Sequence, residues 1–198
     1  MKKMTTVDKL LKAAKTEFSK KGFSRTTVED ITNRAGVAKG TFYIYFDAKE
    51  DTVKFMLDEM YCSITDILDE LILKLGNPQS DFAAVFKEVI MKTLQEYMNL
   101  KEVIVVVMYS DYELSKKLKL LKEQNIGKIR EYIRRILELC IAHGYMRKVN
   151  VDVAASIILT LFMHFSIDVL FNENPAKLEY YVDALEDFVI NGMINREQ

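Results

Sequence analysis

The chain has 198 residues, of which 49% are hydrophobic and 29% charged, a balance typical of a globular protein and not of a disordered chain. With only 7 glycines and 2 prolines it has too few turn-forming residues for a many-stranded β fold, so long helices are favoured. The formal net charge of -1 conceals an asymmetry, because residues 1–50 contain 11 basic and 6 acidic side chains and so carry +5, which suits contact with a polyanion.

An apolar stripe predicts the first helix over residues 6–21. Its members recur at steps of three and four residues: Val7, Leu10, Leu11, Ala14 and Phe18. Thr5 is placed to cap this helix, with Asp8 three positions on, and Gly22 is placed to end it.

Two short helices are predicted next, over about 28–35 and 38–45. Thr27 is a good N-cap for the first of them, and Asp30 stands at the reciprocal position of a capping box. Gly36 ends that helix and leaves a tight corner before the next one. Two helices of this length joined by such a corner form a helix-turn-helix, and Phe42 and Phe46 are predicted to hold it as part of the core.

Longer helices make up the rest of the chain. We expect them over about 48–75, 79–98, 112–143, 150–171 and 174–190. The run Val103–Met108 could be a buried strand if taken alone, but it has no partner strand, so a short buried helix is the better interpretation. The predicted fold is all-α with about nine helices, in two domains: a helix-turn-helix domain over 1–48 and a helical effector-binding and dimerisation domain over 49–198.

The second short helix has the chemistry of a DNA reader. In a helix-turn-helix, the first residues of the second helix enter the major groove. Lys39 can donate to guanine or to phosphate, and Gly40 lets the backbone approach the duplex. Phosphate contacts are expected on both sides of this helix. The predicted DNA-binding residues are Thr27, Lys39, Gly40, Thr41, Tyr43, Tyr45 and Lys49.

The string over residues 26–49, TTVEDITNRAGVAKGTFYIYFDAK, resembles the DNA-binding signature of the TetR family of repressors. Thr32 and Tyr45 depart from it, where alanine and histidine respectively are common. The resemblance implies a homodimer that binds a palindromic double-stranded DNA operator. It also implies that a small effector in the C-terminal domain changes the separation of the two reading helices and releases DNA. Activation instead of repression stays open.

The last two predicted helices are apolar on more than one face, which favours dimerisation over burial inside one subunit. The predicted interface residues are Ile157, Leu161, Phe165, Tyr181, Leu185 and Phe188. Aromatic and methionine side chains on the middle helices suit a cavity for a neutral or lipophilic effector, although such residues are more often ordinary core. The candidates are Phe86, Tyr97, Met108, Tyr109, Tyr112, Phe162, Met163 and His164.

Other classes of function fit less well. His143 and His164 have no metal-binding or catalytic spacing, and no phosphate-binding glycine loop is present, so neither an enzyme, a metal site nor a cofactor is expected. Cys62 and Cys140 lie too far apart for a metal pair or a disulfide framework, which favours the cytoplasm. The apolar run 153–167 is too short to span a membrane. The alternative is a helical interaction protein that has lost DNA binding. The charge of +5 on residues 1–50 argues against it.

Overall fold

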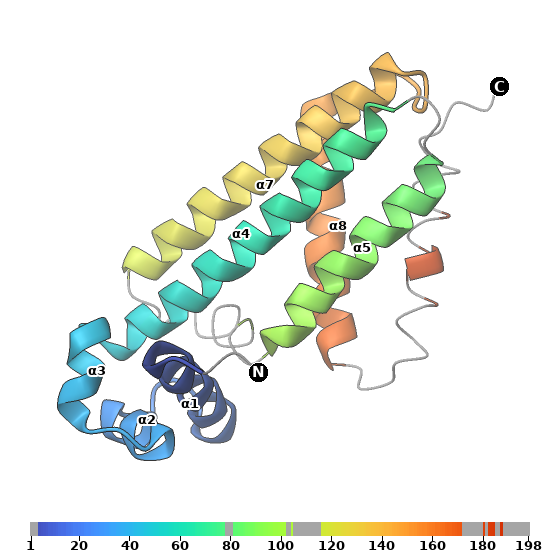
Figure 1. Ribbon diagram of the computed structural model, residues 1–198. Coiled ribbons are helices and arrows are strands. Elements are labelled where there is room, and N and C mark those ends of the chain that lie inside the picture. The colour runs from blue at the N-terminus through green and yellow to red at the C-terminus, as the bar shows by residue number, and fades with distance from the viewer. Residues whose placement is uncertain are drawn as a thin grey trace. The chain divides into compact units, whose positions relative to one another are not determined.

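The computed structural model describes residues 4–77, 81–101, 104, 116–171, 180, 182–184 and 187. Its regular elements are helices (Figure 1): α1 (Thr6–Lys21), α2 (Val28–Ala35), α3 (Lys39–Tyr45), α4 (Lys49–Leu75), α5 (Phe82–Asn99), α7 (Lys116–Ala142) and α8 (Val151–Phe171). The first three match their predicted ranges to within one residue. Most of the predicted short helix at 103–108, and most of the last helix from residue 174 on, lie outside the described residues.

The chain divides into two compact units, Met1–Tyr61 with Leu100–Glu123, and Cys62–Asn99 with Gln124–Gln198. The division falls inside α4, which is one continuous helix. The domain boundary at residues 48 and 49 stays a prediction. No described helix is long and apolar enough to cross a membrane.

In the first unit, two capping boxes set the starts of α1 and α2. The Thr5 Oγ1 accepts from the backbone N–H of Asp8 at 3.1 Å, and the Asp8 carboxylate accepts from the Thr5 N–H at 2.8 Å. Thr27 and Asp30 repeat this arrangement at α2. Gly22 and Gly36 end the two helices at φ 77° and 68°, conformations that a side chain would disfavour. These caps confirm the local predictions.

The three short helices share one apolar core. α1 packs against α2, and α2 against α3. The buried side chains include Leu10, Ala14, Phe18, Ile31, Phe42 and Phe46. Because isolated helices as short as α2 and α3 are marginal in water, this shared core holds them in place.

A cluster of charged side chains also joins α1 to α2. Glu17 is only 5% exposed, and its carboxylate accepts a hydrogen bond from Arg34 and pairs with Lys21 at 3.5 Å. Lys21 in turn donates to Asp30 at 2.5 Å. The Arg34 hydrogen bond outweighs burial and lowers the pKa of Glu17. The buried carboxylate is therefore paired, as a charge removed from water must be.

The second unit is built from the later part of α4 with α5, α7 and α8. α5 packs against α8 through Ile90 and Leu94, which form a buried cluster with Val182. Lys74 and Lys92 bridge Glu70 of α4 and Glu88 of α5. The Tyr132 hydroxyl donates to Asp69 at 3.0 Å, which ties α7 to α4. These contacts hold α4, α5, α7 and α8 together in the second unit.

Candidate nucleic-acid interface and ligand cavity

The orientation of α3 follows from two buried phenylalanines. Phe42 is 0% exposed, Phe46 is buried one turn later, and their ring centroids lie 5.4 Å apart. Residues four apart share a face of a helix, so these rings fix which side of α3 turns inward. Lys39, Tyr43 and Tyr45 are exposed as a result. The prediction that Phe42 and Phe46 are core residues is confirmed.

The first turn of α3 is open to an approaching molecule. A Cβ placed on Gly40 would meet nothing within 4 Å apart from its chain neighbours and the backbone of α3 itself. Thr41 is half-buried, and its backbone N–H donates to the Ala38 carbonyl at 2.9 Å. A backbone this accessible, beside the exposed Lys39, matches what a major-groove reader needs.

Lys49 serves the fold of the first unit. Its ammonium donates to the carbonyls of Phe23, Ser24 and Thr26 at 2.8, 3.1 and 2.9 Å. It also lies 4.5 Å from the centroid of the Phe23 ring. All three N–H groups of the ammonium are thus directed at the loop between α1 and α2. The predicted phosphate contact would require the Lys49 ammonium to give up part of this set.

Thr27 is likewise engaged within the first unit. Its hydroxyl donates to the Asp30 carboxylate at 2.8 Å and accepts from the Asp30 N–H at 3.1 Å. The donor that a phosphate oxygen would need is therefore already in use. The structure gives the Thr27 side chain the role of a helix cap, and a phosphate contact by its hydroxyl would require it to release Asp30.

Ile44 is the residue of this surface that the sequence interpretation passed over. It is 75% exposed, although it is large and aliphatic. Its position could have been deduced, because it lies two residues from both Phe42 and Phe46 and therefore falls on the opposite side of the helix.

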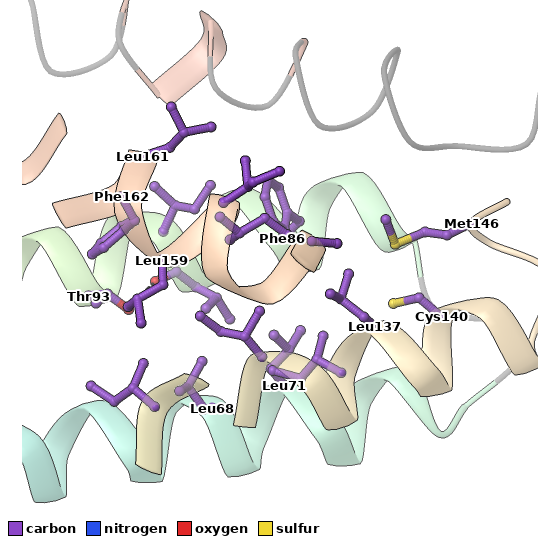
Figure 2. A pocket seen from close by; sticks show the side chains of 18 of the residues that line it. Leu68, Leu71, Phe86, Thr93, Leu137, Cys140, Met146, Leu159, Leu161 and Phe162 are labelled. Atoms are coloured by element: carbon purple, nitrogen blue, oxygen red, sulfur yellow. Dashed lines mark hydrogen bonds between the residues drawn. The ribbon is translucent and has the colours of Figure 1, made fainter. Parts of the chain in front are cut away.

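The second unit contains an apolar cavity of about 430 Å³. It lies among α4, α5, α7 and α8, and Figure 2 shows side chains of these helices turned toward it. Most lining residues are aliphatic: Ile64, Leu68, Leu71, Leu75, Val89, Ile90, Ile129, Ile133, Ile136, Leu137, Val149, Val153, Ala154, Ile157, Ile158, Leu159 and Leu161. The volume lies in the range of small-molecule sites.

Three predicted effector residues, Phe86, Tyr97 and Phe162, line this cavity. Met163 is half-buried and His164 is exposed, and neither is among the lining residues. The other three candidates, Met108, Tyr109 and Tyr112, lie outside the described residues. The aliphatic lining was missed because leucine and isoleucine at helical spacing look the same in sequence whether they face a cavity or a filled core.

Polar groups at the cavity are few. The Thr93 hydroxyl donates to the Val89 carbonyl at 2.8 Å, so its hydrogen is already used. Burial raises the pKa of the Cys140 thiol to about 12, which keeps it neutral. The Tyr97 ring meets the Phe162 ring edge-on at 5.8 Å. Arg147 is the one charged residue of the described lining, and it is itself exposed. The cavity therefore suits an apolar body.

An apolar stripe also runs along the exposed side of α8. Val153, Ile157 and Leu161 follow one another at steps of four, and Ile157 is 52% exposed. Phe165 is half-buried. The remaining predicted interface residues, Tyr181, Leu185 and Phe188, are not among the described ones. Over the described part of the chain, no three His, Cys, Asp or Glu side chains gather as a metal site would require.

Comparison with known proteins places residues 10–54 in a family described as bacterial regulatory proteins, tetR family. The uncharacterized HTH-type transcriptional regulator YvdT of Bacillus subtilis is 32% identical over 99 residues, 50% of this chain and 49% of YvdT. The HTH-type transcriptional repressor KstR2 of Mycobacterium tuberculosis is 33% identical over 84 residues, 40% of this chain and 42% of KstR2. The chain thus matches half or less of the length of these relatives.

The likeness to solved structures extends over nearly the whole chain. A SmeT–triclosan complex superposes with a TM-score of 0.76 at 19% identity, covering 97% of this chain and 93% of SmeT. The predicted all-α fold is therefore confirmed. At this identity the match shows the fold alone.

Proposed function

We propose that the chain is a ligand-responsive transcriptional repressor of the tetR family of bacterial regulatory proteins, whose model matches residues 10–54, and that it binds operator DNA as a dimer. The family is one of regulatory proteins, not of enzymes. The observation that carries the proposal is the outward face of α3, where Lys39, Gly40, Tyr43 and Tyr45 are exposed while Phe42 is buried beneath them.

DNA binding rests on the chemistry of that face. Lys39 is placed to donate to a guanine or a phosphate, and Gly40 and Thr41 lie at the helix start that enters a major groove. The phenols of Tyr43 and Tyr45 reach toward the phosphates at the groove edges. These five residues remain from the predicted set once Thr27 and Lys49 are assigned to the fold.

Repression, as opposed to activation, is proposed by analogy with the relative KstR2, which carries the name of a repressor. Two reading helices about one helical turn, ~34–36 Å, apart would fit successive major grooves of a palindromic site. The apolar stripe Val153, Ile157 and Leu161 supports self-association through α8.

The effector is proposed to occupy the cavity of the second unit. Its mostly aliphatic lining favours a neutral or lipophilic molecule. The neighbour SmeT holds the small molecule triclosan. Effector binding would change the separation of the two reading helices and release DNA.

Fluorescence anisotropy tests the DNA-binding part. The full chain is titrated into a labelled nonspecific duplex at low salt, and the titration is repeated as salt is raised. We expect binding that weakens steeply with salt, because cationic side chains displace counterions from phosphate. No binding below ~100 µM at low salt would remove the repressor proposal and leave a helical interaction protein without DNA binding as the alternative.

A further inference from the structure

Ile44 occupies the centre of the solvent-facing side of α3. It lies about 160° around the helix from the buried Phe42, at 3.6 residues per turn. It is 75% exposed, more than any other large hydrophobic side chain described in the first unit. Gly40 lies four residues earlier and so shares its face. An exposed aliphatic residue on a surface needs no special explanation in general, but this one stands where α3 is proposed to meet DNA.

Helix geometry places Ile44 next to Gly40. Side chains of an α-helix lean toward its N-terminus and cover the preceding turn. In α3 that turn presents Gly40, which has no side chain and has free space where a Cβ would stand. The Gly40/Ile44 surface therefore joins accessible backbone to an aliphatic group and offers no side-chain donor or acceptor.

The groups around the Gly40/Ile44 surface are polar at their tips. Lys39 ends in an ammonium, and Tyr43 and Tyr45 end in hydroxyls. An apolar patch built to dock another protein would extend over neighbouring side chains. A single aliphatic residue among hydrogen-bonding groups instead matches the major groove, where an apolar methyl group stands among polar base edges.

That methyl group belongs to thymine. The 5-methyl is the large apolar group of the major groove, whereas the nitrogen and oxygen atoms of the base edges are hydrogen-bond donors or acceptors. Isoleucine pressed against those edges would leave them unsatisfied. We propose that Ile44, with Gly40 beside it, is a specificity-determining contact for the 5-methyl group of one thymine in each operator half-site. This inference rests on the proposed DNA-binding function.

Replacing thymine by deoxyuridine removes that methyl group and leaves base pairing unchanged, which isolates the proposed contact. Duplexes that bind the full chain are first enriched from a library with a randomised core. Each thymine of the enriched operator is then replaced in turn by deoxyuridine, and dissociation constants are measured for the parent, Ile44→Ala and Leu73→Ala. Leu73 is the matched control, since it is a 78% exposed aliphatic residue on α4.

For the parent and for Leu73→Ala, we expect one position per half-site at which deoxyuridine weakens binding about fourfold, the value of one buried methyl group. For Ile44→Ala, we expect weaker binding to the thymine operator and no difference between thymine and deoxyuridine at that position. Because Ile44 is exposed, its variant should keep the parent's thermal midpoint, which a melting curve checks.

Two results would overturn the inference while leaving DNA binding in place. One is a parent that tolerates deoxyuridine at every position. The other is an Ile44→Ala variant that still discriminates at the same position as the parent, since some other residue must then contact the methyl group. If the parent enriches no duplex and binds none at low salt, the proposed function fails first and the inference falls with it.

Discussion

At the scale of single residues, the two lysines of the helix-turn-helix differ in where their ammonium groups go. Lys39 is exposed on α3, whereas Lys49 donates to three backbone carbonyls of the loop before α2. Substituting each should therefore change a different property: DNA affinity for Lys39 and stability for Lys49.

Lys39→Ala is expected to weaken binding to the enriched operator by about 1–3 kcal/mol if Lys39 reads a base. The loss would then be confined to that operator, and nonspecific binding would change little. If Lys39 contacts only a phosphate, both kinds of duplex would lose affinity and the salt slope would fall by about one. Lys20→Ala, at the exposed end of α1, is the control. Parent-like binding to both duplexes would show that α3 is not the reading helix.

Lys49→Met is expected to destabilise the protein, because it keeps the apolar stem and removes the ammonium. Hydrogen bonds to a charged group contribute about 1.5–3 kcal/mol each, and a partly exposed set such as this contributes toward the low end in total. Thermal or denaturant unfolding measures the change. The salt slope of DNA binding should stay at the parent's value, and a slope reduced by about one would restore Lys49 as a phosphate contact.

At the scale of elements, Asp30 attaches α2 to α1. Its carboxylate accepts hydrogen bonds from Lys21 of α1 and from Thr27 at the start of α2. The Lys21 ammonium and the Thr27 backbone N–H together lower the pKa of Asp30 to about 2. A lowered carboxyl pKa means that the folded state favours the charged form. The stability it contributes is complete above the ordinary value of 3.8 and is lost as the pH falls toward about 2.

Asp30→Asn should therefore lower the thermal midpoint at about pH 5, and the gap to the parent should narrow as the pH falls, because the parent's carboxylate is then protonated. Melting curves of the parent and the variant, recorded between about pH 5 and about pH 2, give the two thermal midpoints to compare. Glu59→Gln, at an exposed position in the middle of α4, provides the control. A gap that does not change with pH would mean that the charge of Asp30 contributes nothing to holding α2.

The elements that could be predicted from sequence are those fixed by near neighbours in the chain. Thr5 with Asp8, and Thr27 with Asp30, are three residues apart, so their capping boxes were predicted and are confirmed. The hydrogen bonds of Lys49 could not be predicted, because its acceptor carbonyls lie 23 to 26 residues earlier and only the fold brings them together. The cavity was predicted only through Phe86, Tyr97 and Phe162, since aliphatic residues at helical spacing do not show whether the space they face is filled.

At the scale of the whole molecule, the cavity and the α8 stripe carry the proposed regulation. Ala154 of α8 is buried and lines the cavity. Ala154→Leu should fill part of the space with little change in helix propensity. Operator binding is expected to stay at the parent's level while release by lipophilic molecules is lost. The same substitution at the exposed Ala142 serves as the control. If Ala154→Leu still releases DNA normally, the effector binds elsewhere.

Self-association is proposed to depend on the exposed stripe of α8. Ile157→Lys places a charge on that stripe, and burying an unpaired charge in an interface is costly. We expect the parent to sediment as a dimer and the variant as a monomer with weaker operator binding. Leu73→Lys alters an equally apolar exposed position on α4 and should remain dimeric. A parent that sediments as a monomer would contradict the proposed dimer.

Val153, Ile157 and Leu161 are exposed on α8 and also line the cavity. Dimerisation and effector binding would then be coupled, because they use the same side chains. The coupling is reciprocal: if dimerisation changes the affinity for the effector by some factor, the effector changes the affinity of the two subunits for each other by the same factor. If the effector displaces these side chains outward and so weakens dimerisation, the monomer binds the effector more tightly than the dimer does. A protein present at low concentration, which is more often monomeric, would then respond to less effector than an abundant one. The copy number of the protein would then tune its own sensitivity, and a strain that overproduces it would need a higher dose for the same response.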